Sequence, residues 1–275
     1  MIIVIQCTDQ LGLVAAISNI LAEQKINIVS LREHVDKAEN RFFIRLQTEQ
    51  SADVEMLEQK MKRVLPPDSI IAINPLPEKK IVVMVSKEYH CLADILTRNY
   101  FGTLGASVQC VIGNHAVLED FCQRYDIPFF HISFDQQDRA GFEQHISDTI
   151  HQFNPDYIVL AKFMRILSAS FVSQFPMRII NIHHSFLPAF IGASPYRQAY
   201  ERGVKLIGAT AHFVTDDLDQ GPIIEQQIIP VNHSHKPEDM IKAGREVETS
   251  VLARALQLVF DDRVIVYKNK TVVFN

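Results

Sequence analysis

Residues 157–184, YIVLAKFMRILSASFVSQFPMRIINIHH, run from an apolar strand-like segment through a helix-length segment into a second apolar strand. The same alternation occurs upstream, with IVVMVS from Ile81, SVQCVIG from Ser107 and IPFFHI from Ile127. Apolar strands that alternate with helices predict a parallel sheet covered on both faces. Such sheets bind ligands beyond the carboxyl ends of their strands, so we expect the functional residues there.

The segments after His184 complete this domain. Two further strands, near Ala209–Thr215 and Ile223–Ile229, are expected to extend the edge of the sheet, and Pro237 begins a long helix with an apolar stripe. We therefore predict a Rossmann-like, mostly parallel α/β domain over residues 80–275.

A smaller domain precedes it. Residues 2–75 show the order βαββαβ, which predicts a ferredoxin-like α/β sandwich over residues 1–76. Ser51 is the expected cap of its second helix. The polar, proline-bearing stretch from Pro75 to Lys80 can continue neither a helix nor a strand, so the domain boundary is placed there.

Composition excludes several classes of protein. A net charge of -5 offers no general attraction to nucleic acid, and the eleven histidines are scattered along the chain. The first ten residues, MIIVIQCTDQ, lack a basic region, and no apolar run reaches membrane-spanning length. We expect a cytoplasmic protein with neither a membrane nor a nucleic-acid partner. The four cysteines form no metal-ligand pattern, so buried free thiols and no metal are expected.

Polar residues that suit acyl chemistry follow the last parallel strand. Asn181 and His183 are two residues apart, so on a strand their side chains point the same way. Asp219 precedes Gly221 and Pro222, which suits a tight turn that delivers a carboxylate to a distant partner. An amide and a cationic imidazole stabilise a tetrahedral oxyanion, while the carboxylate holds the imidazole or orients a water.

Structural roles are the alternative for each of these groups. An Asn-x-His pair at a strand end is commonly a loop cap, and His184 and His212 taken singly suit satisfied histidines near the core. Asp216 and Asp217 suit solvated turn acids.

The segments 181–196 and 208–226, in this order, resemble the folate-dependent formyltransferase family over roughly residues 80–260. The resemblance implies that Asn181, His183 and Asp219 form a catalytic triad and that LAKFMRIL, from Leu160, receives the pterin ring through its backbone. It implies no cofactor beyond the folate substrate. The alternative for LAKFMRIL is a strand running into a helix, with two of its side chains simply in the core. The residues implied to bind folate are Met164, Arg165, Ile166, Leu167, Val214 and Asp216.

The formyl acceptor separates the branches of this family. Its glycinamide ribonucleotide formyltransferases carry a glycine-rich loop after the first strand of this domain, whereas residues 86–96, SKEYHCLADIL, contain no glycine. Bulky side chains there oppose a close backbone approach to phosphate. Four motifs are similar to the deformylase branch, which feeds one-carbon and purine metabolism by hydrolysing 10-formyltetrahydrofolate. They span Ser86–Leu96, Asn181–Ser185, Phe190–Ala199 and Gly244–Ala255.

Two other functions are also compatible with this sequence. One is a formyltransferase that uses 10-formyltetrahydrofolate and an amine acceptor, of the glycinamide ribonucleotide type. The other is a non-catalytic amino-acid sensor that merely binds folate, against which the three triad residues speak.

The N-terminal segment 8–31 resembles an ACT domain, a small ligand-sensing module. The resemblance implies an amino-acid effector near Asp9, Gly12, Leu13 and Asn27, where a helix start offers free amides, and a homo-oligomer is expected. The alternative is an oligomerisation platform without a ligand.

Overall fold

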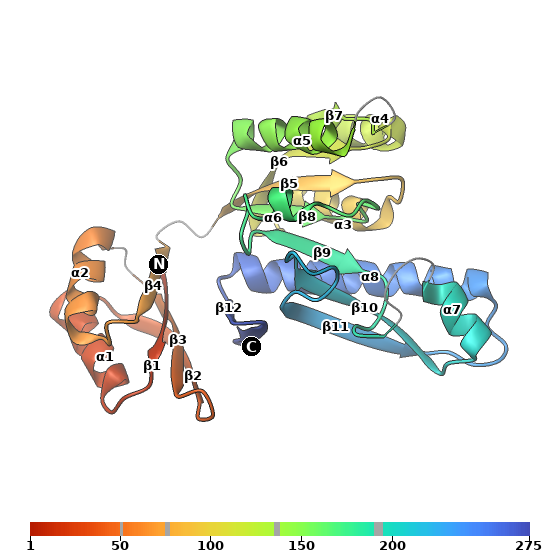
Figure 1. The fold of residues 1–275 in the computed structure, drawn as a ribbon. Helices are drawn as coiled ribbons and strands as arrows, with labels where there is room; N and C mark the ends of the chain where they lie inside the picture. Colours follow the sequence, from red (N-terminus) through yellow and green to blue (C-terminus); the bar gives the residue numbers. More distant parts are fainter. Residues whose placement is uncertain (50–51, 75–77, 135–137, 190–194) are drawn as a thin grey trace. The chain divides into compact units, whose positions relative to one another are not determined.

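The computed structural model describes residues 1–49, 52–74, 78–134, 138–189 and 195–275. The chain divides into two compact units, Met1–Pro77 with Asp261–Asn275, and Glu78–Phe260. Figure 1 labels most of the helices and strands of each unit. Among the described helices, none combines the length and the apolar character needed to cross a membrane.

The N-terminal unit contains the predicted βαββαβ order. Its four-stranded sheet has the order β2-β3-β1-β4, and each neighbouring pair is antiparallel. This is the ferredoxin-like arrangement expected from the sequence, so that prediction is confirmed. The elements are β1 (Ile2–Thr8), α1 (Leu13–Glu23), β2 (Ile28–Asp36), β3 (Arg41–Thr48), α2 (Val54–Val64) and β4 (Ile70–Asn74).

The cap of α2 differs from the prediction. The Asp53 carboxylate accepts a hydrogen bond from the Met56 backbone N–H at 3.1 Å, so Asp53 is the N-cap. Ser51 lies outside the described residues. An aspartate directly before the first helical residue is the better cap because its carboxylate also faces the positive end of the helix dipole.

Both faces of the N-terminal sheet are used. On β3, Phe42 and Ile44 pack into the core beneath the helices, while Phe43 packs with Ile265 and Phe274. Alternate residues of a strand point to opposite faces, so the C-terminal segment covers the face that the helices leave open.

The assignment of residues 80–275 to one domain is therefore wrong at its end. The second unit ends at Phe260, and the following hairpin of β12 (Val264–Tyr267) and β13 (Lys270–Val273) belongs to the first unit. The Arg45 guanidinium, on the same sheet face as Phe43, donates to the backbone oxygen of Asp261 at 2.8 Å. The local sequence of the hairpin does not predict the sheet on which it packs.

The second unit is built on a seven-stranded sheet in the order β11-β10-β9-β8-β5-β6-β7. The pairs from β9 to β7 are parallel, and β10 and β11 extend the edge in antiparallel pairs. The mostly parallel Rossmann-like sheet is thus confirmed. Its strands are β5 (Lys79–Val85), β6 (Ala106–Gly113), β7 (Phe129–His131), β8 (Tyr157–Leu160), β9 (Ile179–His183), β10 (Leu206–Phe213) and β11 (Ile223–Pro230).

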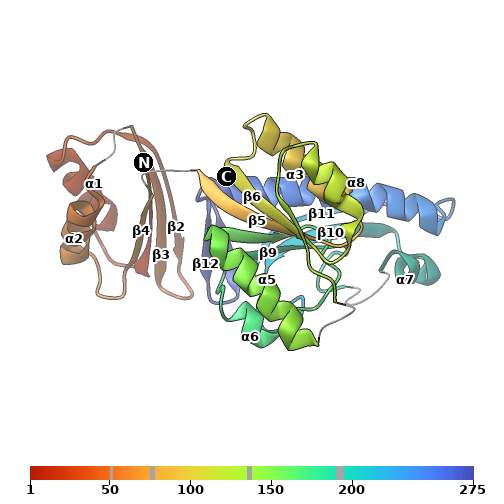
Figure 2. The same ribbon diagram turned by 90° about the horizontal axis from the view of Figure 1, so that it is seen from above.

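Helices cover both faces of this sheet. Figure 2 shows α5 and α6 on one face and α3 and α8 on the other. The helix that begins at Pro237 continues to Phe260, as its apolar stripe predicts. The helices are α3 (His90–Tyr100), α4 (Glu119–Gln123), α5 (Arg139–Phe153), α6 (Ala169–Val172), α7 (Pro195–Arg202) and α8 (Pro237–Phe260), with a 3-10 turn at Ala116–Leu118.

The direction of chain progression reverses beside β5. The chain runs from β5 outward to β6 and β7, then returns to β8 on the other side of β5 and continues to β9. A crevice forms at the carboxyl ends of the strands at such a switch point. The loops after β5, β8 and β9 therefore meet at one place.

Candidate active site

Asn181 and His183 lie on the last residues of β9, where their spacing places both side chains on one face. Asn181 pairs across the ladder with His212 of β10, and its Nδ2 lies 3.3 Å from Nε2 of that histidine. Nδ1 of His212 is 2.8 Å from the Phe213 backbone oxygen. A carbonyl only accepts, so Nδ1 carries the proton and Nε2 accepts from the Asn181 amide.

Asp219 reaches the same place from the turn after β10. Its Oδ1 lies 3.3 Å from Nδ1 of His183 and 3.8 Å from Nε2 of His212. The turn is closed by a hydrogen bond from the Phe213 backbone N–H to the Pro222 oxygen. The prediction that this turn delivers a carboxylate to a distant partner is confirmed.

The electrostatics favour an ionised Asp219 carboxylate. Burial opposes ionisation of Asp219, but the hydrogen bond and the charge of His183 outweigh it and lower the pKa of that carboxyl. Burial lowers the pKa of His212, which agrees with its neutral tautomer. Among the described residues, the buried Nε2 of His183 has no hydrogen-bond partner. That nitrogen is left for a ligand.

These residues line a cavity of about 270 Å³. All the side chains predicted to bind folate lie on its wall, together with Asn181, His183 and Asp219, so the structure brings both predicted sets into one pocket. The pocket is lined by Leu160, Lys162, Phe163, Met164, Arg165, Ile166, Leu167, Asn181, Ile182, His183, His184, His212, Val214, Thr215, Asp216, Leu218 and Asp219.

The segment after β8 forms one wall of this pocket and is fixed there by hydrogen bonds to neighbouring segments. The Met164 backbone N–H donates to the Ser86 hydroxyl at 2.9 Å, and Arg139 donates to the Ile166 backbone oxygen at 2.9 Å. The Met164 and Ile166 side chains are 56% and 64% exposed. Their exposure excludes the alternative in which they belong to the core.

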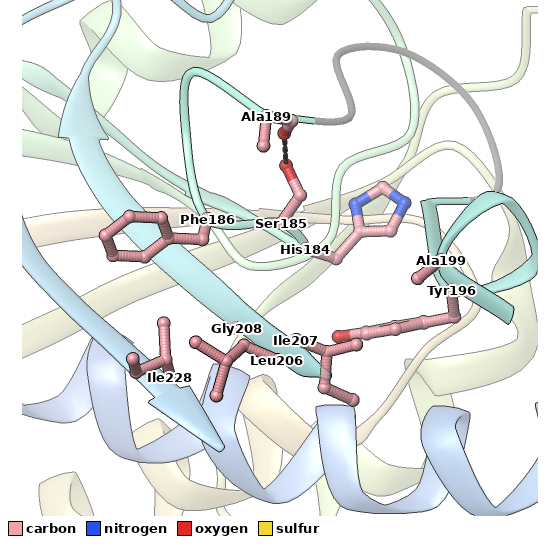
Figure 3. A pocket seen from close by; sticks show the side chains of 10 residues that line it. All are labelled: His184, Ser185, Phe186, Ala189, Tyr196, Ala199, Leu206, Ile207, Gly208 and Ile228. Atoms are coloured by element: carbon pink, nitrogen blue, oxygen red, sulfur yellow. Dashed lines mark hydrogen bonds between the residues drawn. The ribbon is translucent and has the colours of Figure 1, made fainter. Parts of the chain in front are cut away.

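His184 and Lys162 also line the pocket, and a second, apolar cavity of about 150 Å³ adjoins it at His184. Figure 3 shows the His184 ring standing beside Tyr196, above the aliphatic side chains of Ile207 and Ile228. His212 is buried and both of its ring nitrogens have hydrogen-bond partners, as the structural alternative expects, and it also neighbours Asn181 and Asp219. Its place on the strand opposite Asn181 becomes visible only once the register of β9 and β10 is known.

The predicted effector residues lie at the first turn of α1 and the start of β2. Gly12, with φ 91°, precedes α1 without a side-chain cap, a conformation that favours glycine. Leu13 is buried in the core, so its side chain is not available to a ligand. The Asn27 amide donates to Glu49 at 3.3 Å. An effector role for Asp9, Gly12, Leu13 and Asn27 stays a prediction.

All four cysteines are buried free thiols, as expected from the sequence. Burial raises the pKa of Cys110 and of Cys122 to about 12, so neither is ionised at neutral pH.

Comparisons with known proteins agree with this architecture. Residues 79–256 match the formyl transferase family and residues 1–63 match the ACT domain family. The chain is similar to the formyltetrahydrofolate deformylase of Haemophilus influenzae, at 48% identity over 99% of this chain and 98% of that protein. It is 43% identical to the formyltetrahydrofolate deformylase of Bacillus subtilis, over 99% of this chain and 93% of that protein.

Solved structures give the same relation. The crystal structure of a formyltetrahydrofolate deformylase from Pseudomonas syringae pv. tomato superposes with a TM-score of 0.94 at 40% identity, covering 100% of this chain and 94% of that chain. Glycinamide ribonucleotide transformylase 1 from Symbiobacterium toebii superposes with a TM-score of 0.69 at 30% identity, covering 72% of this chain and 95% of that chain.

Proposed function

The chain belongs to the family of formyltetrahydrofolate deformylases, an ACT domain followed by a formyl transferase domain, and we propose that it hydrolyses 10-formyltetrahydrofolate to tetrahydrofolate and formate. The observation that carries this proposal is the His183–Asp219 pair beside Asn181 on the wall of the pocket. The substrate is a formamide, so the reaction is hydrolysis of a linear amide bond at N10.

In the proposed mechanism, the formyl oxygen accepts hydrogen bonds from the Asn181 amide and from Nε2 of protonated His183. Both groups stabilise the oxyanion that forms when water attacks the formyl carbon. Asp219 orients the imidazole and the attacking water. The proton that water gives up passes to N10 as the C–N10 bond breaks, and formate leaves. No side-chain nucleophile takes part.

Folate is proposed to lie along the segment from Met164 to Leu167 and against Val214 and Asp216. Backbone groups of this segment suit a pterin ring, which presents both donors and acceptors at its edge. The exposed side chains of Met164 and Ile166 offer apolar contact at the mouth of the pocket. Independence from metal ions and from further cofactors is part of this proposal.

A formyltransferase with an amine acceptor is the alternative reaction. It is less well supported because α3 begins at His90 after the glycine-free loop, with Tyr89 at the cap position. Bulky side chains at that helix start oppose the close approach of a substrate phosphate. The cytoplasmic location, the homo-oligomeric state and an amino-acid effector stay predictions.

The direct test is to incubate the purified protein with 10-formyltetrahydrofolate and no amine, and to measure tetrahydrofolate and formate. We expect the two products in equal amounts. Turnover that starts only when an amine is added would contradict the proposal.

A further inference from the structure

A buried carboxylate joins three segments next to the pocket. Glu248 of α8 is 1% exposed, and one of its oxygens, Oε2, lies 2.8 Å from Nε2 of His90 and 3.1 Å from Nζ of Lys162. Its other oxygen accepts a hydrogen bond from the Tyr196 hydroxyl at 2.6 Å. These residues come from α3, the loop after β8, α7 and α8. We call them the Glu248 network.

Within the network, the Glu248 carboxylate and the Lys162 ammonium form a buried ion pair. Burial opposes ionisation of Glu248, but the hydrogen bond from His90 and the charge of Lys162 outweigh it and lower the pKa to about 2. Lys162 is only 7% exposed, so its ammonium has little access to water. Moving one member of such an ion pair away leaves the other charge buried and unpaired. This cost holds both side chains in place.

A metal site is the competing interpretation of part of this cluster. Ligand atoms of His90, Cys91 and Glu248 lie within 4.8 Å of one another. The Glu248 oxygen that faces His90 already faces the Lys162 ammonium, however. A cation beside that ammonium would be repelled, so the cluster suits a hydrogen-bond network.

The network stands directly behind the reactive end of the pocket. His184 follows His183, and their ring centroids are 5.3 Å apart. The His184 ring in turn lies 6.1 Å from the Tyr196 ring, and Figure 3 shows the two side by side. Lys162 and His184 both line the pocket. The wall beside His183 therefore consists of side chains backed by the Glu248 network.

We propose that the Glu248 network is the specificity element that restricts the formyl acceptor to water. This inference rests on the proposed deformylase function. Folate occupies the side of the pocket formed by residues 164–167 and 214–216, so a second substrate has to approach His183 past Lys162 and His184. With Lys162 tied to Glu248, that approach admits water and excludes a larger amine.

The excluded reaction differs only in its nucleophile. With water, an O–C bond forms, the C–N10 bond breaks, a proton moves to N10, and formate leaves. With a primary amine, an N–C bond forms, the same C–N10 bond breaks, the amine proton moves to N10, and a formamide leaves. Both reactions release tetrahydrofolate, so the label carried by the formyl carbon distinguishes them.

Lys162→Gly is the sharpest test. Lys162 has φ 64°, a conformation that glycine adopts without strain, so the substitution removes the side chain and leaves the backbone path intact. Isotope-labelled 10-formyltetrahydrofolate is supplied with glycinamide, a small primary amine without phosphate. We expect the ratio of labelled N-formylglycinamide to formate to rise at least about tenfold over that of the unaltered chain.

The matched control is Arg197→Ala, which removes an exposed ion pair with Glu201 on α7. This variant is expected to keep the ratio of the unaltered chain. A folded Lys162→Gly protein that turns over folate with an unchanged ratio would overturn the inference. Absence of any turnover in the unaltered chain would instead count against the proposed function, so the two failures are distinguishable.

Tyr196→Phe keeps the inference testable if the glycine variant does not fold. It removes one hydrogen bond to Glu248 and preserves the volume of the ring. We expect about a threefold rise in the same ratio, because the carboxylate and Lys162 gain freedom to move. An unchanged ratio in folded, active Tyr196→Phe protein would contradict the network's role in excluding amines.

Discussion

At the scale of single residues, Asp219 and His183 depend on each other. The carboxylate is partly buried and keeps a lowered pKa because the imidazole faces it at 3.3 Å. The imidazole, in turn, is held with Nδ1 toward the carboxylate, which leaves Nε2 for the substrate. Neither group can be replaced by a neutral isostere without loss of this polarisation.

Asp219→Asn is expected to lower kcat by about three orders of magnitude, because the amide can neither stabilise the imidazolium nor orient the attacking water. Folate binding should change little, since the proposed pterin contacts lie on the 164–167 segment. Steady-state kinetics and equilibrium folate binding check both statements. Asp217→Asn, an exposed acid in the same turn, is the control and should keep full activity. An active Asp219→Asn protein would remove this residue from the mechanism.

Glu248 makes a pH-dependent contribution to stability. Its folded-state pKa is about 2 against an ordinary value of 4.5, so the contribution is complete above about pH 4.5 and is lost as the pH falls toward about 2. The size is on the order of 3 kcal/mol. Denaturant unfolding of Glu248→Gln should show a deficit in free energy of unfolding that narrows as the pH falls through this window.

Glu246→Gln, an exposed position on the same helix, is the control for this experiment and should show no such narrowing. A deficit for Glu248→Gln that stays constant from neutral pH to about pH 3 would mean that the carboxylate is not held ionised by its partners.

At the scale of elements, the turn between β10 and β11 decides where Asp219 lies. A Cβ added to Gly221 would sit 1.8 Å from the Phe213 backbone oxygen, and that oxygen belongs to the end of β10 and cannot yield cheaply. Glycine is required here by close packing of two backbones.

Gly221→Ala is therefore expected to displace the Asp219 carboxylate and to lower kcat/KM by about a hundredfold or more, as misplacement by about 1 Å does elsewhere. Kinetics with 10-formyltetrahydrofolate check this, and Gln220→Ala, the adjacent side-chain truncation, serves as the comparison. Equal activity of the two variants would show that the turn tolerates a Cβ and that the packing argument is wrong.

Periodicity and turn chemistry predict most elements of the fold. The alternation of strands and helices from Ile81 onward and the helix from Pro237 both follow from apolar spacing, which is a local property. The cap at Asp53 was missed because both Ser51 and Asp53 are residue types that cap helices and both precede that helix. The hairpin after Phe260 was missed because its assignment depends on an open sheet face more than two hundred residues earlier, near Phe43.

Some residues of the candidate site are likewise predictable from local sequence, and others are not. Asn181 and His183 are predictable because a two-residue spacing on a strand fixes a common direction. Glu248 is not, because its partners His90, on α3, and Lys162, in the loop after β8, meet α8 only in the packed structure. Motif similarity marks these residues, but only the packed structure shows that they contact one another.

At the scale of the whole molecule, the ACT domain suggests control of the catalytic domain by a small molecule. We expect an amino acid tied to one-carbon supply, with glycine and methionine as first candidates, to bind near Asp9, Gly12 and Asn27. Binding should change folate affinity by about five- to a hundredfold, the usual size of such coupling. Calorimetry with the full chain measures the binding, and kinetics at saturating amino acid measure the coupling.

Asn27→Ala should weaken this binding, whereas Gln59→Ala, an exposed position on α2, should not. Absence of heat with all of the amino acids would leave the ACT domain only a role in assembly.

The formyl group is expected to go to water even when a natural amine acceptor is present. A decisive experiment supplies formyl-labelled 10-formyltetrahydrofolate together with glycinamide ribonucleotide and follows the label. We expect labelled formate at the same rate with and without the ribonucleotide, because the glycine-free helix start at His90 and the wall formed by Lys162 and His184 leave no site for it. Label in formylglycinamide ribonucleotide would contradict it.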